Sequence, residues 1–331
     1  MKKLILSLLL VASVLGANAQ NRKHIANFQL FQHYYNPSLT GYEGSQLKGF
    51  HRNQWTGFEG APRTYFASAE LDLADLSGWQ QNDVLKTKQH DFFDRQAGAR
   101  HAFGVSVLQD TFGPFSESQV HLGYASRVRL SEKLSLRWGG ALTYSAQRLD
   151  GNRLTVDNEN DPEFQGVLGQ RLRQGKLDLN LGWTLTADKF YFGYAMQDVT
   201  KGGIVSGGDE FLQDLYTRKH LLQAGYRKAL SDQFGLVANA LLQYDDELKE
   251  SAELQLKAVY QNMLWLGGSY RQDLAWSATA GLRLDQFRIG YVYEIPVQNA
   301  RHVSRSTNEI SLTYNLIPVK YPKYGRQVTI W

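Results

Sequence analysis

One residue, His121, has a type and position that could support catalysis, because it lies on the polar face of an alternating segment. A histidine there could activate a serine nucleophile, as in barrel-type lipid hydrolases. The sequence offers neither a nucleophile elbow nor a paired-histidine motif to support this chemistry. We therefore expect no catalytic residues and no enzymatic activity.

Metal chemistry would need a cluster of ligands, and the best candidate is the acidic loop Asp157, Glu159 and Asp161. Pro162 stands where a calcium loop of the EF-hand type has its turn glycine, and Leu168 stands where the bidentate glutamate belongs. A solvated loop is the better interpretation. We expect no metal and no cofactor.

Composition excludes several further classes of protein. The 331 residues include no Cys, so disulfide frameworks, thiolate metal sites and Cys nucleophiles are excluded. The formal net charge is only +4, which gives no electrostatic case for binding nucleic acid. The mean hydropathy of −0.40 would suit a soluble protein, but strict alternation of polar and apolar residues also dilutes hydrophobicity.

The first 19 residues are typical of a secretory signal peptide. Lys2 and Lys3 form a basic head, residues 4–15 are apolar apart from small residues, and Ala17-Asn18-Ala19 is a small-x-small cleavage site. We predict cleavage after Ala19. No later apolar run approaches the roughly 20 residues of a spanning helix, so the exported chain is either soluble or a β-barrel.

The remainder of the chain alternates with period 2, which indicates strands with one apolar face. The clearest case has leucines and a tryptophan at 177, 179, 181, 183 and 185, with polar residues or glycine between them. We expect about fourteen strands, each long enough to cross a bilayer. They are placed near 45–55, 63–72, 102–109, 120–130, 134–144, 177–185, 190–198, 219–230, 234–244, 251–260, 263–271, 276–284, 287–294 and 307–316.

Connection lengths alternate too, which is the layout of an outer-membrane barrel. Tight turns stand at 131–133, 187–189, 231–233, 261–262 and 285–286, and longer polar connections at 149–175, 199–218, 245–250, 272–275 and 295–306. The long connection 73–101 breaks this rule. Aromatic residues near the strand ends fit two membrane girdles, with Tyr144, Tyr244 and Tyr293 on one side. A soluble β-sandwich, the alternative, would show no such asymmetry.

The N-terminal third resembles the PorP/SprF family of Bacteroidota outer-membrane proteins, which is associated with type IX secretion and gliding motility. The resemblance rests on YYNPSLTG at 34–41, RNQWTGF at 52–58, GAPRT at 60–64, and FGV at 103–105 followed by DTFGP at 110–114. Ser38 departs from the alanine that the family shows more often. Family membership would imply an outer-membrane barrel that delivers or retains secreted adhesins by binding their C-terminal sorting domains.

We take five residues of these blocks as candidate partner-binding residues: Asn36, Pro37, Arg52, Gln54 and Trp55. The Asn-Pro pair could enter the lumen as a hatch, or it could be only the turn before the first strand. Charged residues on the polar strand faces are expected to point into the lumen and hold it together. They are Arg127, Arg129, Arg137, Asp178 and Glu253.

The sequence thus predicts a signal peptide (1–19), an N-terminal segment (20–43), a transmembrane barrel in the outer membrane (44–316) and a tail (317–331). The tail could be a late strand, a periplasmic docking peptide or an assembly signal. The first functional hypothesis is a non-enzymatic barrel for type IX secretion or surface anchoring. Its partners would be a secreted surface protein with a C-terminal sorting domain, other type IX components and membrane lipid. The alternative is a channel for hydrophobic small molecules.

Overall fold

The computed structural model describes residues 24–75, 90–91, 101–154, 169, 171–201, 204–206, 217–245, 250–297, 305–320 and 328–331. The predicted signal peptide and the acidic loop 157–161 lie outside these ranges. Within them, every helical turn is short, and no helix is long and apolar enough to cross a membrane.

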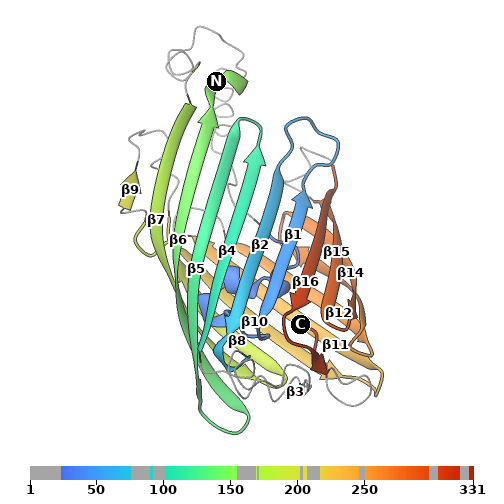
Figure 1. The fold of residues 1–331 in the computed structure, drawn as a ribbon. Helices are drawn as coiled ribbons and strands as arrows, with labels where there is room; N and C mark the ends of the chain where they lie inside the picture. Colours follow the sequence, from blue (N-terminus) through green and yellow to red (C-terminus); the bar gives the residue numbers. More distant parts are fainter. Residues whose placement is uncertain are drawn as a thin grey trace, which may run out of the picture.

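The described part of the chain forms a closed antiparallel barrel of fourteen strands (Figure 1). Each strand pairs with its sequence neighbours in the barrel, and β16 closes it by pairing with β1. The strands are β1 (Gln46–Asn53), β2 (Arg63–Asp72), β4 (His101–Phe112), β5 (Phe115–Arg129), β6 (Leu134–Asp150), β7 (Arg171–Ala187), β8 (Phe190–Gln197), β10 (Lys219–Ala229), β11 (Phe234–Asp245), β12 (Ser251–Tyr260), β13 (Leu264–Arg271), β14 (Ala275–Leu284), β15 (Phe287–Pro296) and β16 (Thr307–Asn315). The predicted fold class is confirmed.

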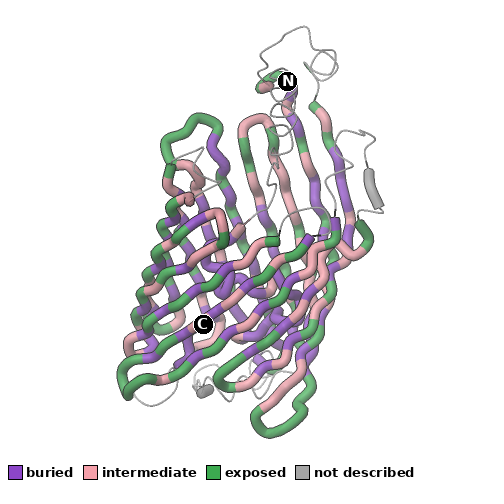
Figure 2. The backbone as a smooth tube through the Cα atoms, turned by 180° about the vertical axis from the view of Figure 1, so that it is seen from behind, coloured by how far each residue is buried: buried purple, intermediate pink, exposed green. Residues whose placement is uncertain are grey.

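Exposure alternates along the strands, as Figure 2 shows by its repeated change of colour. On β7, Leu181 and Trp183 are exposed, whereas Asn180 and Thr184, which flank this pair in the sequence, are buried. The apolar residues therefore face outward, toward lipid, and the polar residues face the interior. This is the arrangement of a membrane barrel, and the reverse of a soluble sandwich.

Most tight turns lie at one end of the barrel and most longer connections at the other, but the two-residue turn between β4 and β5 lies at the long-connection end (Figure 1). The long connection predicted at 73–101, which breaks the alternation of connection lengths, is present on the tight-turn side. It contains β3 (His90–Asp91), which pairs in parallel with β17 (Val319–Lys320) in the tail. The tight turn between β12 and β13 spans residues 261–263 and has positive φ at Gln261 and Asn262, as the two central residues of a type I′ turn require.

Three neighbouring strands extend beyond the expected ends. β5, β6 and β7 have 15, 17 and 17 residues, and all three are longer on the long-connection side. The connection expected at 149–175 is correspondingly shorter, because β6 runs to Asp150 and β7 begins at Arg171. The short strand β9 (Ile204–Ser206) pairs with β7 near Lys176. The added residues are mostly polar on both faces, so the apolar alternation that marks the bilayer could not reveal them.

Candidate functional site

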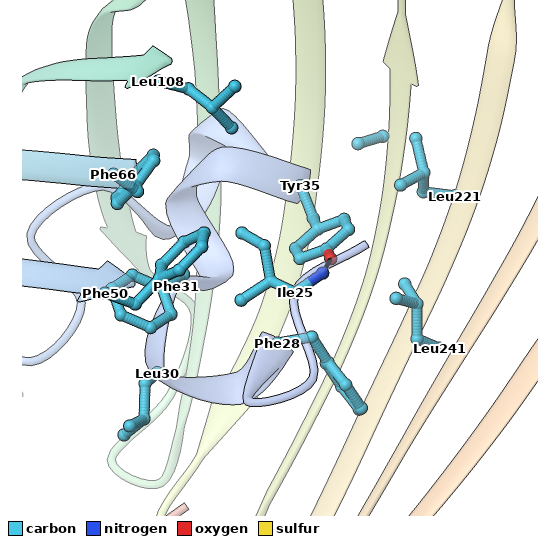
Figure 3. Packing of buried hydrophobic residues seen from close by; sticks show 11 residues of the cluster. Ile25, Phe28, Leu30, Phe31, Tyr35, Phe50, Phe66, Leu108, Leu221 and Leu241 are labelled. Carbon is cyan, nitrogen blue, oxygen red and sulfur yellow. Dashed lines mark hydrogen bonds between the residues drawn. The ribbon is translucent and has the colours of Figure 1, made fainter. Parts of the chain in front are cut away.

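The barrel interior is filled by the N-terminal segment, residues 24–43, which we call the plug. It consists of three short helical pieces: η1 (Phe28–Leu30), α2 (Gln32–Tyr35) and η2 (Pro37–Leu39). Figure 3 shows the plug's aromatic side chains against those of the strands. The ring of Phe31 lies 4.9 Å from that of Phe50 on β1 and 5.3 Å from that of Phe66 on β2. An apolar plug core thus sits inside a barrel whose other inward residues are largely polar.

Barrel side chains hold the main chain of the plug. Arg137 on β6 donates through Nε to the carbonyl of Ser38 and through Nη2 to that of Thr40, both at 2.9 Å. Glu309 on β16 accepts from the main-chain N–H groups of Ala26 at 2.9 Å and Asn27 at 3.0 Å. These charge-assisted bonds satisfy main-chain groups that a short helical piece leaves unpaired.

Two further barrel residues bond the main chain of the plug. Gln197, at the end of β8, donates to the carbonyls of Tyr34 at 2.8 Å and Tyr35 at 3.1 Å. Glu70 on β2 accepts from the N–H of Gly41 at 2.7 Å. The plug is therefore fixed from β2, β6, β8 and β16, on several sides of the barrel.

Asn36 and Pro37 lie at the centre of the plug and are buried, so the pair enters the lumen. The Asn36 side chain caps η2 by accepting from Ser38 N at 3.1 Å, and its Nδ2 donates to Thr184 Oγ1 on β7 at 3.1 Å. Glycines on β6, β7 and β8 make room for it. A Cβ at Gly139 would lie 2.6 Å from the Pro37 carbonyl oxygen, and one at Gly182 would overlap Asn36 itself.

Arg52 is fully buried on β1 between two carboxylates. Its guanidinium lies 2.9 Å from Glu294 and 3.3 Å from Glu309, and Glu294 also pairs with Arg271 at 2.9 Å. Glu309 thus links Arg52 to the plug. Because breaking a buried pair leaves an uncompensated charge, the first role of Arg52 is to hold the lumen together.

Gln54 and Trp55 lie where β1 ends, at the rim on the long-connection side. In the amide orientation that satisfies both groups, the Gln54 oxygen accepts from Arg52 Nε at 2.9 Å. The Trp55 ring contacts those of Phe58 (centroids 6.4 Å apart) and Phe112 (5.6 Å). Its φ of 49° is unusual for a bulky residue and costs about 1–2 kcal/mol. Of the five candidate residues, these two reach the rim, whereas Asn36, Pro37 and Arg52 lie inside.

The other charged residues that were predicted to face the lumen are also of two kinds, buried inside the barrel or exposed. Arg127, Arg137, Asp178 and Glu253 are buried inside, as expected. Arg129 is exposed instead, and its guanidinium donates to the carbonyls of Ser131 at 3.0 Å and Glu132 at 3.4 Å. The prediction for Arg129 was wrong, because β5 ends there and the side chain folds over the tight turn.

Ionisable plug residues show the effect of burial. Burial lowers the pKa of His33 to about 4; Glu70, 3.1 Å away, opposes this, and Lys48 adds to it. Burial also lowers the pKa of His24, with Arg271 and Arg52 acting in the same direction. Although burial alone would raise it, the pKa of Glu43 is lowered by Arg288 and Lys48. At neutral pH the plug therefore carries neutral histidines and an ionised Glu43.

The end of the tail also lies inside the barrel, on the tight-turn side of the plug. The Trp331 ring lies under the guanidinium of Arg227 at 4.1 Å and meets the Tyr191 ring at 4.9 Å. Lys257 Nζ donates to the main-chain oxygen of Trp331 at 3.1 Å, and Thr329 N donates to Asn262 at 2.9 Å. Residues 328–331 thus form a second element in the lumen, which none of the three sequence interpretations of the tail describes.

His121, the one catalytic candidate, faces the plug. Its partners are Thr143 Oγ1 at 3.0 Å, Gln119 Oε1 at 3.3 Å and the ring of Tyr34 at 5.1 Å. Among the described residues, no group of three His, Asp or Glu side chains could hold a metal ion.

The anchoring residues Arg137, Glu309, Gln197 and Glu70 were not singled out as plug contacts by sequence reasoning. The available signal was glycine in the middle of strands, at 139, 182 and 193, where a strand needs no glycine unless another part of the chain approaches closely.

These features define a class of protein: an outer-membrane β-barrel whose lumen is filled by its own N-terminal segment. The chain belongs to the family of the type IX secretion system membrane protein PorP/SprF, whose model matches residues 17–314. The resemblance drawn from the sequence is confirmed, and the protein is an outer-membrane component associated with type IX secretion.

A comparison with curated proteins finds no match. Among solved structures, the CymD monoaromatic hydrocarbon channel has 14% identity and a TM-score of 0.49, covering 88% of this chain and 93% of that one. A FadL homologue of Pseudomonas aeruginosa has 10% identity and a TM-score of 0.45, with coverages of 85% and 92%. CdiB from Acinetobacter baumannii has 6% identity and a TM-score of 0.42, with 82% of this chain covered, and the chain spans 59% of its length. All three relationships are distant.

Proposed function

We propose that this protein is a non-enzymatic barrel that supports type IX secretion by holding a secreted, adhesin-like surface protein at its long-connection rim. The observation that carries the proposal is the plug, which is bonded through its main chain to four strands. A lumen closed in this way suits a docking scaffold better than a passage. The partner would present a C-terminal sorting domain, and other type IX components would be further partners.

The rim offers a surface for such a partner. Trp55, Phe58 and Phe112 form an aromatic cluster, and Phe58 is 51% exposed. Exposed aromatic residues are typical anchors of protein interfaces. The unusual φ of Trp55 supports a functional role, because strained residues concentrate at such sites. We therefore assign partner binding to Gln54 and Trp55, and to Asn36, Pro37 and Arg52 an indirect role through the plug that supports the rim.

The proposal includes the orientation of the barrel and the division of the chain. We propose that the signal peptide is removed after Ala19, that residues 20–43 form the plug segment, that the barrel spans 44–316, and that 317–331 form the tail. The tight turns would face the periplasm, and the long connections the exterior.

Surface proteomics of deletion and wild-type cells tests the function. We expect one adhesin or a small set of them to disappear from the surface, with normal growth. Trp55→Ala with Phe58→Ala should reproduce this loss while the barrel still reaches the outer membrane. Phe234→Ala is the matched control, because Phe234 is equally exposed, at 51%, but lies at the tight-turn end.

The alternative function, a channel for hydrophobic small molecules, predicts the opposite result. Deletion would then leave the surface proteome unchanged and impair growth on long-chain lipids or hydrophobic carbon sources. The apolar core under the plug would be the site of such a ligand, but it is occupied by the side chains of Phe28, Phe31 and Ile25. A growth defect of this kind with an intact surface proteome would refute our proposal.

A further inference from the structure

A row of polar and basic side chains crosses the outer face of the barrel near the long-connection rim. Residues directly opposite one another on successive strands build it: each is the registered partner of the next from β1 to β7. In order, the row consists of Asn53, Arg63, Thr111, Ser116, Arg148 and Arg173. It contains three arginines and no carboxylate.

These arginines point outward. Arg63 shares its face of β2 with Tyr65, and Arg148 shares its face of β6 with Tyr144, both of which are exposed on the lipid side. Arg63, Arg148 and Arg173 are themselves exposed. None of them takes part in an ion pair of the described structure. Several inward charges, in contrast, form ion pairs, as Arg52 does with Glu294 and Lys48 with Glu70.

The strongest feature of the row is the pairing of Arg148 with Arg173. Two like charges directly opposite on an antiparallel pair have Cβ atoms about 5 Å apart and destabilise the sheet. Two residues farther along, Arg171 on β7 is registered opposite Asp150 on β6, so that pair is neutral and leaves Arg148 opposite Arg173 as the unbalanced pair of like charges. A cationic surface of this kind is kept at a cost to stability, which an anionic ligand would offset.

The height of the row identifies the region of the membrane that it meets. Tyr65 and Tyr144 belong to the outer aromatic girdle, which sits at the headgroup level. Arg63 is two residues beyond Tyr65. Arg148 is four residues beyond Tyr144, or about 13 Å along the strand, and about 10 Å once strand tilt is included. Figure 1 shows β6 and β7 rising beyond the rest of the barrel here.

We propose that the outward faces of β2, β6 and β7 bind the phosphate groups of a phosphorylated glycolipid in the outer leaflet. Arginine suits this ligand, because its planar fork binds phosphate through two parallel hydrogen bonds. The headgroup layer of an ordinary phospholipid is only about 5–8 Å thick, so it would reach Arg63 but not the Arg148–Arg173 pair. A glycolipid with phosphates on a saccharide head spans both. The hydroxyls of Thr111 and Ser116 between the arginines can bond the sugar.

This inference depends on the predicted orientation of the barrel but not on the proposed secretion partner. The test is lipid binding by the purified full chain in detergent, measured by native mass spectrometry. The probes are a bis-phosphorylated lipid A with core sugars, the same lipid after dephosphorylation, and phosphatidylglycerol. The variant is Arg148→Gln with Arg173→Gln. The control is Arg129→Gln, an exposed arginine at the opposite end.

We expect the wild-type chain and the control to bind the phosphorylated glycolipid at least tenfold more tightly than either other lipid. The double variant should lose that preference while remaining folded, as judged by unchanged heat modifiability on a gel. Two results would overturn the inference: equal binding of the dephosphorylated lipid or of phosphatidylglycerol by the wild type, or unchanged preference in the double variant. If the double variant fails to fold, the single changes Arg148→Gln and Arg173→Gln are measured in its place, since each alters one exposed side chain.

Discussion

The guanidinium of Arg137 lies on the inner face of β6 with its Nη2 atom 2.9 Å from the carbonyl oxygen of Thr40, which follows η2 in the plug. Its Nε bonds the carbonyl of Ser38 at the same distance. One barrel side chain therefore satisfies two main-chain acceptors at the end of a helical piece. Attachment through main-chain atoms does not depend on the plug's side chains. It fixes the position of the plug relative to the strands of the closed barrel.

Replacing this arginine should loosen the plug. We expect Arg137→Met to lower the free energy of unfolding by about 2–4 kcal/mol, because two buried carbonyls lose charged donors. Hydrogen exchange should become faster in residues 36–42, and denaturation in detergent should shift to lower denaturant concentration. Arg129→Met, at the exposed turn, should change neither. Equal exchange rates in the plug of both variants would contradict an anchoring role for Arg137.

A second prediction concerns the lipid-facing surface. Leu181→Arg should destabilise the barrel by about 2–4 kcal/mol, since it places a charge in the apolar belt, whereas Leu181→Phe should be tolerated. The measurement is folding into lipid vesicles as a function of urea. If both variants fold with the same midpoint, Leu181 does not face lipid.

The inner neighbour, Asn180, behaves differently from a residue in a water-filled lumen. Its Nδ2 donates to Thr143 at 2.8 Å and its Oδ1 accepts from the N–H of Asp198 at 3.0 Å. Arginine at position 180 has no space in this filled interior, so it should also destabilise the protein. The lumen is thus packed like the core of a soluble protein, and a larger side chain placed in it should destabilise the protein.

The sequence predicted the barrel well and its interior poorly, for a physical reason. Each of the fourteen strands has one face toward lipid and one toward polar residues, which imposes a period of two that a single sequence displays. The contacts that fill the lumen join residues such as Arg137 and Ser38, or Trp331 and Arg227, far apart in the chain. No local period marks them. The extended ends of β5, β6 and β7 were not predicted either. They lie beyond the lipid, so no alternation of apolar and polar residues marks them.

The candidate residues were predicted from a resemblance, which marks positions that matter without saying why. Arg52 and Asn36 lie inside the barrel with bonds to Glu294 and Thr184, so a structural need accounts for them. Trp55 has no comparable need, since it lies at the rim with a strained backbone. The distinction between the two kinds of residue required the fold.

The orientation of the barrel can be tested with inserted tags. A tag after Asn152, in the short helical piece η3 (Gly151–Arg153) at the long-connection end, should be labelled on intact cells. A tag at Glu132, in the tight turn between β5 and β6, should be labelled only after the outer membrane is opened. A tag after Trp331 is unsuitable, because that residue is buried in the lumen. Labelling of Glu132 alone on intact cells would reverse the orientation.

The last prediction concerns pH. His33 has a pKa lowered to about 4 by burial in the plug, against an ordinary value of 6.5. A histidine whose pKa is depressed by folding favours the native state above pH 6.5, and that stability is lost as the pH falls through 6.5 toward 4. The full effect is on the order of 3 kcal/mol. His24 acts in the same direction, and Glu43, whose pKa is lowered, adds its own loss only below its ordinary value of 4.5.

The urea midpoint of the native barrel, measured relative to that of His33→Asn, should therefore fall as the pH is lowered from 7 to 5, a range in which Glu43 remains ionised. The variant lacks this titrating group, although its stability at pH 7 falls through lost packing. His101→Asn is the control, because His101 is exposed at the barrel end and its ring bonds the exposed side of the barrel, at Tyr124. The measurement is the urea midpoint of the three proteins at pH 7, 6 and 5. Parallel pH profiles for His33→Asn and the wild type would show that His33 is not held neutral in the plug.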